Sequence, residues 1–139
     1  MNQQVRWLRL CYWIGAIIDA LATVPLIFPG LAASLYRWTS FTPGPELRSV
    51  SGVGASLMLG WTALLLWADR KPIERKGVLV LTVFPVLVTM LINRVIDVSQ
   101  GVISFQDALP FGILQVVLVV LLTFSYLQAG SAEIAPRRA

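Results

Sequence analysis

Long apolar runs separated by short polar stretches make up most of the chain. Four of these runs are long enough to cross about 30 Å of hydrocarbon at about 1.5 Å per helical residue. The strands of a membrane barrel would be shorter and would alternate between apolar and polar residues. The pattern therefore predicts four transmembrane helices, at about residues 8–28, 50–68, 77–98 and 108–128, followed by a short tail over 129–139.

The composition agrees with a chain that lies largely in a membrane. Hydrophobic residues make up 57% of its 139 residues and charged residues only 13%, whereas soluble domains carry about 25% charged residues. The mean hydropathy is +0.76. We therefore predict an all-α integral membrane protein, a four-helix bundle that forms a single domain over residues 1–139.

The first apolar run has a second interpretation, as a cleaved signal peptide. Arg6 and Arg9 precede it, and the small residues of "ALA" at 20–22 resemble a cleavage site. However, the apolar core of a signal peptide has only about 7–15 residues. The run here is longer and carries Asp19 in its middle, which favours a retained helix.

The positions of the eleven basic residues predict the orientation of the helices. Eight lie on one side of the predicted membrane and three on the other or at its edge. The eight are Arg6, Arg9, Arg70, Lys71, Arg75, Lys76, Arg137 and Arg138, and the three are Arg37, Arg48 and Arg94. Because basic loops stay inside, both termini are expected in the cytoplasm, with the chain in an inner or plasma membrane.

The net charge of +4 does not indicate a nucleic-acid partner. The basic residues form short clusters between apolar runs, and no segment carries the extended basic face that nucleic-acid binding requires. Clusters of this kind contact the anionic headgroups of membrane lipids. Membrane lipids are therefore the expected partners.

Several classes of chemistry lack the residues that they need. The chain has one cysteine, Cys11, and no histidine. This excludes a two-cysteine thiol relay, zinc sites of cysteine and histidine, histidine-ligated haem and histidine-activated nucleophiles. No metal or cofactor is expected, and Cys11 is interpreted as a small apolar residue at a helix start.

A stripe of small residues opens the second predicted helix. Gly52, Ser56 and Gly60 recur at every fourth position and so share one helical face. Small residues allow two membrane helices to approach closely. We predict that this face packs within the bundle, and the alternative is the interface of a homodimer.

Polar residues inside the apolar runs are candidates for a ligand site. An aspartate at the middle of the membrane costs about 2.5–3.5 kcal/mol on insertion scales. Asp19 lies roughly 18 Å along its helix from Trp7, and Arg94 roughly 25 Å from the start of the third run, so an arginine side chain can bridge the difference. We predict an inward-facing network of Asp19, Asn93, Arg94 and Asp97, together with Gln115.

Two other interpretations of this network remain open. The polar residues can fix the register of the helices without binding any ligand, or Arg94 can extend outward to the membrane surface with Asp97 as its partner. Glu46 and Arg48 lie just outside the second run. Glu46 suits a helix start because it complements the helix dipole; alternatively, the pair forms the rim of an outward-facing pocket.

The segment "PELRSVSGVGASLMLGW" resembles the start of the second helix in the bacterial four-helix membrane families around DoxX. In several of these families an acidic residue, a basic residue and glycines open that helix, which corresponds here to Glu46, Arg48, Gly52 and Gly54. The resemblance implies a layout of four spans with small loops. Some relatives are linked to thiol redox or quinone-associated complexes, but no catalytic residue carries over to this sequence.

Three functions are compatible with the sequence. The first is a non-enzymatic membrane protein that binds a lipid-like or other small amphiphilic ligand in an outward-facing polar pocket, or serves as a subunit of a membrane complex. The second is an intramembrane enzyme on a lipid-soluble substrate, with Asp19 or Asp97 as acid or base. The third is a small proton-coupled transporter. We favour the first, because the polar network lies in an apolar bundle with almost no extramembrane part.

Overall fold

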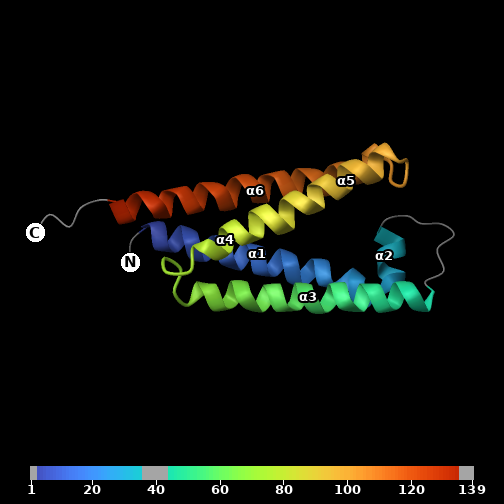
Figure 1. The fold of residues 1–139 in the computed structure, drawn as a ribbon, viewed down its shortest axis with the longest axis horizontal. Coiled ribbons are helices and arrows are strands. Elements are labelled where there is room, and N and C mark those ends of the chain that lie inside the picture. Colours follow the sequence, from blue (N-terminus) through green and yellow to red (C-terminus); the bar gives the residue numbers. More distant parts are fainter. Residues whose placement is uncertain (1–2, 36–43, 135–139) are drawn as a thin grey trace, which may run out of the picture. The chain divides into compact units, whose positions relative to one another are not determined.

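The computed structural model describes residues 3–35 and 44–134, and every regular element in these two ranges is a helix. The elements are α1 (Gln3–Ile27), α2 (Pro29–Leu35), α3 (Pro45–Asp69), α4 (Gly77–Leu81), η1 (Thr82–Val88), α5 (Thr89–Ser99) and α6 (Phe105–Ile134) (Figure 1). Three of the basic residues used to predict the orientation, Arg37, Arg137 and Arg138, lie outside the described ranges.

Within the described part of the chain, four helical segments are long and apolar enough to cross a membrane, as predicted. They are Val5–Ile27, Pro45–Asp69, Gly77–Ser99 and Phe105–Gln128. The second begins at Pro45, ahead of the predicted start at residue 50. Proline suits the first turn of a helix, and Glu46 in the same turn complements the helix dipole. The protein is therefore a multi-pass membrane protein.

The chain forms two compact units, which are described separately. One unit contains residues 13–67, and the other contains residues 1–12 together with residues 68–139. Both α1 and α3 contribute to each unit, because the division passes through these two helices. The predicted single domain over residues 1–139 stays a prediction.

In the unit of residues 13–67, α1 and α3 pack side by side. A Cβ atom added to Gly15 would lie 3.4 Å from Leu65 Cδ1, and one added to Gly54 would lie 3.6 Å from Leu26 Cδ1. These two contacts pair the early part of α1 with the end of α3 and the end of α1 with the early part of α3. The two helices are therefore antiparallel, and small residues allow their close approach.

The predicted stripe of small residues does not take part in this packing. Gly52, Ser56 and Gly60 are exposed, and a Cβ atom added to either glycine would meet nothing within 4 Å. The face of α3 that approaches α1 carries Gly54 and the buried Ala55 instead. The structure thus gives the stripe no packing partner among the described residues, and the homodimer interface stays a prediction.

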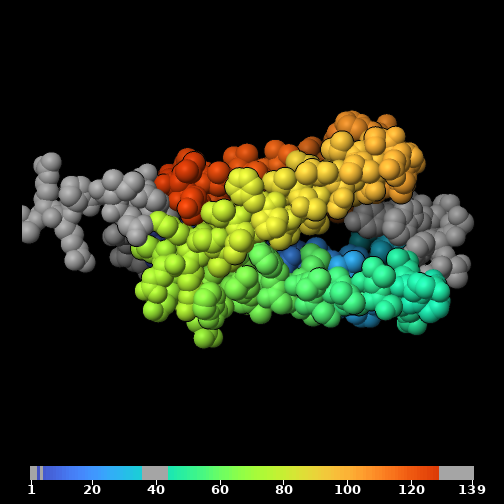
Figure 2. Space-filling view, in the orientation of Figure 1, coloured from blue at the N-terminus to red at the C-terminus, as the bar shows by residue number. Residues whose placement is uncertain are grey.

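In the other unit, α4, η1 and α5 follow one another as a single span and pack against α6 (Figure 1). The space-filling view shows the orange-to-red surface of α6 beside the yellow surface of this span (Figure 2). The middle of the span formed by α4, η1 and α5 is the π-helical segment η1, which contains Pro85. Proline cannot donate the usual backbone hydrogen bond, and a wider turn accommodates this loss.

A tight turn connects α5 to α6 and sets the two helices side by side. Gly101 has a φ of 70°, and its amide donates to the Val98 carbonyl at 3.1 Å. Glycine adopts this left-handed conformation without steric cost, which ends α5. Ser104 then caps α6, because its Oγ accepts from the Asp107 amide at 3.2 Å and donates to Asp107 Oδ2 at 2.6 Å.

Candidate ligand pocket between α5 and α6

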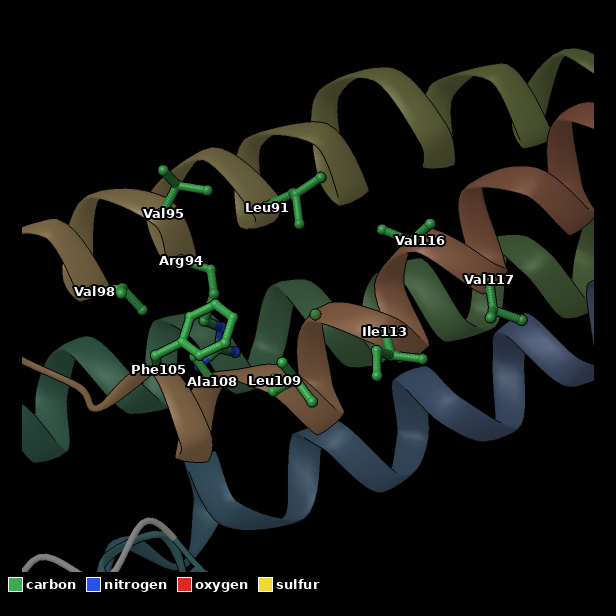
Figure 3. A pocket seen from close by; sticks show the side chains of 11 residues that line it. Leu91, Arg94, Val95, Val98, Phe105, Ala108, Leu109, Ile113, Val116 and Val117 are labelled. Carbon is green, nitrogen blue, oxygen red and sulfur yellow. The ribbon is translucent and has the colours of Figure 1, made fainter.

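A pocket of about 470 Å³ lies between α5 and the first half of α6 (Figure 3). Both helices belong to the same unit. The lining residues are Leu91, Arg94, Val95, Val98, Phe105, Ala108, Leu109, Gly112, Ile113, Val116 and Val117. Arg94 is the one charged side chain among them, and the other side chains are apolar. Pockets that bind small molecules are mostly apolar and have a few polar groups that orient the ligand.

The sequence places these side chains on facing helical stripes. The lining positions on α5 and on α6 each recur at intervals of three or four residues, and so each set lies on one side of its helix. On α6 the stripe includes the small residues Ala108 and Gly112, and a Cβ atom at Gly112 would meet nothing within 4 Å. Small residues between large ones leave the hollow.

Arg94 has an unusual environment for a cation. Its guanidinium carbon lies 5.4 Å from the centroid of the Phe111 ring, within the range of a cation–π interaction. Its Nε atom is buried and has no hydrogen-bond partner in the described ranges. A buried donor without a partner is costly unless a ligand or water accepts from it.

Of the five residues predicted to bind a ligand, Arg94 alone lines this pocket. Asn93 is exposed. Asp97 is half-buried, and its carbonyl accepts from the Val102 amide at 2.9 Å in the turn after α5. Gln115 is buried, and its Oε1 has no partner among the residues that the structure describes. The pocket between α5 and α6 is therefore apolar around one arginine, and the predicted polar network of all five residues stays a prediction.

Asp19 belongs to the unit of residues 13–67, where a residue of α3 is its partner. Thr62 Oγ1 donates a hydrogen bond of 2.8 Å to Asp19 Oδ2. Sequence reasoning missed Thr62, although it is the single hydroxyl residue in the last dozen residues of α3. The predicted pairing of Asp19 with Arg94 would join the two units and stays a prediction.

Glu46 and Arg48 lie at the start of α3 and are both exposed. Glu46 occupies the first turn, as expected of an acidic residue that complements the helix dipole. Neither residue lines the pocket between α5 and α6. Their alternative role as the rim of a pocket stays a prediction.

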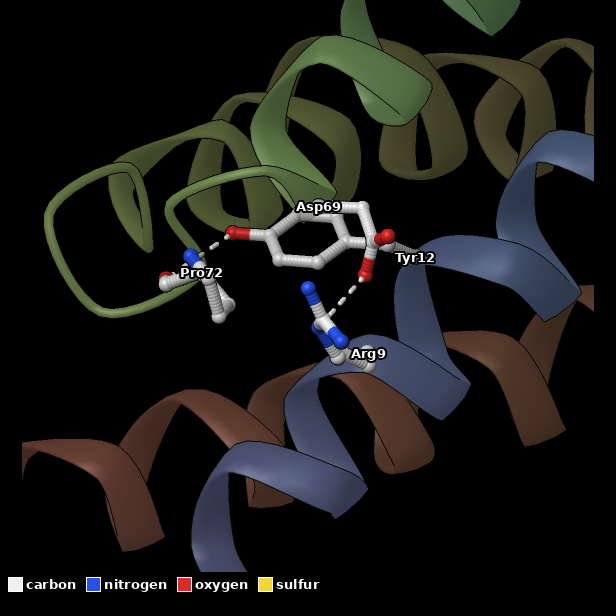
Figure 4. A network of polar contacts seen from close by, with 4 residues as sticks. All are labelled: Arg9, Tyr12, Asp69 and Pro72. Atoms are coloured by element: carbon white, nitrogen blue, oxygen red, sulfur yellow. Dashed lines mark hydrogen bonds and ion pairs between the residues drawn. The ribbon is translucent and has the colours of Figure 1, made fainter. Parts of the chain in front are cut away.

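A group of polar contacts joins the start of α1 to the loop before α4 (Figure 4). The Tyr12 hydroxyl donates to the Arg75 carbonyl at 3.0 Å, and the Pro72 carbonyl lies at 3.4 Å. Arg9 Nε lies 3.5 Å from Asp69 Oδ1. Tyr12 is fully buried, whereas the Arg9 side chain is 44% exposed. Because ion pairs at the surface contribute little, the tyrosine is the stronger part of this connection.

The described residues contain no cluster of three or more histidine, cysteine, aspartate or glutamate side chains that could hold a metal ion. Comparison with known proteins finds no matching family model, no matching curated protein and no matching solved structure. The resemblance to the families around DoxX therefore stays a prediction.

Proposed function

We propose that the protein is a non-catalytic membrane protein that holds one amphiphilic molecule in the pocket between α5 and α6. One observation carries this proposal: a buried Arg94 Nε without a hydrogen-bond partner in the described ranges borders an otherwise apolar pocket. The apolar walls suit a hydrocarbon chain, and the guanidinium suits a polar head. An amphiphile combines these two parts in one molecule.

The hydrogen bond between Thr62 and Asp19 favours a structural role for that aspartate over acid–base chemistry or proton transport. It engages one carboxylate oxygen and joins α1 to α3 inside one unit. Interhelical hydrogen bonds of this kind fix the relative register of membrane helices. A role as a subunit of a larger complex is compatible with the same pocket, because an amphiphile bound there can also contact a partner protein.

A photoactivatable hexadecanol with a diazirine in its chain tests the pocket in proteoliposomes. We expect the label on the α5–α6 peptides to exceed that on the exposed face of α1 by threefold or more. Gly112→Leu fills the hollow and should remove this excess, whereas Gly60→Leu places the same side chain on an exposed face of α3 and should leave it unchanged. Even labelling of all exposed faces in the wild type would contradict the proposal.

We also propose that both termini lie in the cytoplasm, with the turn between α5 and α6 on the other side of the membrane. The basic residues at the start of α1 and in the loop before α4 support this orientation. Cysteine substitutions in a Cys11→Ser background test it with a membrane-impermeant thiol reagent on intact cells. We expect Gln100→Cys, at an exposed position in the turn between α5 and α6, to be labelled from outside and Lys71→Cys only after permeabilisation. The reverse pattern would overturn the orientation.

A further inference from the structure

We infer that the occupant of the pocket between α5 and α6 is a single-chain carboxylic acid whose carboxylate accepts hydrogen bonds from Arg94. This inference rests on the proposed function and adds the chemical class of the ligand. The charge of the head, the shape of the cation, the depth of the site and the size of the pocket support it in turn.

The charge of the site favours an acceptor with a negative charge. None of the lining residues is acidic, and the guanidinium lies over the ring of Phe111. An aromatic face attracts a cation but accepts no strong hydrogen bond from Nε. An anionic head would supply both the charge and the acceptors, whereas an alcohol or amide head would supply acceptors alone.

The geometry of arginine selects a planar acceptor. Its donors form a rigid planar fork that matches the two oxygens of a carboxylate. Packing of the guanidinium against Phe111 restricts its rotation before any ligand arrives. A site that is organised in advance loses less entropy on binding.

The depth of Arg94 favours a head that can lose its charge on the way in. Arg94 precedes Ser99, the last residue of its span, by five residues, or about 7.5 Å of helical rise. A carboxylic acid can enter hydrocarbon in its neutral form and release its proton to water at the nearby end of the span, so that the carboxylate pairs with the guanidinium. A head with a permanent charge would be dehydrated as an ion.

The size of the pocket favours one chain. The pocket has a volume of about 470 Å³, in the lower half of the range of about 300–1,000 Å³ that is usual for small-molecule sites. A pocket of this size suits one chain better than two.

The test measures the binding of radiolabelled dodecanoate, dodecanol and dodecyl phosphate to the full chain at pH 8. The chain is held in nanodiscs of phosphatidylcholine, which is zwitterionic and has no net charge, and the signal of empty nanodiscs is subtracted. We expect dodecanoate to bind at least tenfold more tightly than dodecanol. Arg94→Gln should weaken dodecanoate at least tenfold and change dodecanol by less than twofold. Arg48→Gln removes an exposed arginine outside the pocket and should change neither.

The other outcomes of this experiment distinguish the proposed amphiphile pocket from its proposed carboxylate ligand. Equal binding of dodecanoate and dodecanol, both lost in Gly112→Leu, would overturn the carboxylate and leave the amphiphile pocket intact. Tighter binding of dodecyl phosphate would overturn the carboxylate in favour of a phosphate head. Binding that neither Gly112→Leu nor Arg94→Gln reduces would overturn both proposals. If Arg94→Gln does not assemble, Arg94→Lys replaces it, because lysine keeps the charge without the planar fork and should weaken dodecanoate at least threefold.

Discussion

Tyr12→Ala is expected to lower the free energy of unfolding by about 3 kcal/mol, the lower end of the range found when a large buried aromatic side chain is removed. Tyr12 is fully buried, and its hydroxyl donates to the Arg75 carbonyl at 3.0 Å. The substitution therefore leaves a cavity and also separates the start of α1 from the loop before α4. Reversible unfolding in mixed micelles, followed by circular dichroism, measures the change.

Tyr12→Phe separates the two contributions in this result. It keeps the ring and removes the hydroxyl, and so it should cost only about 1 kcal/mol. Tyr126→Phe is the matched control, because Tyr126 is half-buried and should tolerate the change with little effect. A loss in Tyr12→Ala no greater than that in Tyr12→Phe would show that the buried ring does not stabilise the fold.

Thr62→Val is expected to lower the free energy of unfolding by about 1–2 kcal/mol, because it leaves the Asp19 carboxyl without its donor. Hydrogen bonds between membrane helices contribute up to about 1.7 kcal/mol in double-mutant cycles. The cycle here combines Thr62→Val with Asp19→Leu. We expect the double variant to be less destabilised than the sum of the two single variants.

Thr123→Val is the matched control for this cycle. Thr123 lies on α6 and is exposed, and so its replacement should have little effect alone and should not couple to Asp19→Leu. Independent sites are additive within about 0.3–0.5 kcal/mol. A coupling between Asp19 and Thr62 inside that range would mean that their hydrogen bond does not hold α1 against α3.

The lengths of the apolar runs were sufficient to predict the four long helices. In hydrocarbon a chain must satisfy its backbone hydrogen bonds within each segment, so a long apolar run has one stable form. The start of α3 was predicted too late, at residue 50. Pro45 usually interrupts a helix, and Glu46 and Arg48 are charged, so none of the three counted toward an apolar run. In the structure the first turn of the helix accommodates all three.

The partners of the polar residues were predicted less well. The sequence indicated that Asp19 and Arg94 need partners, because charged groups are costly in hydrocarbon. It did not identify Thr62 as the donor to Asp19, or Phe111 as the ring beside Arg94. Several polar positions lie at similar depths along different runs, and the sequence leaves open which of them meet.

By itself, the sequence determined that this protein is a membrane protein of four apolar helices, because run length and composition are local properties that no later packing changes. The tertiary structure alone decided that the pocket between α5 and α6 is apolar around Arg94 and that the face with Gly52 and Gly60 is exposed. These features depend on the rotation of each helix about its axis. Helices that are apolar nearly all round leave that rotation to packing.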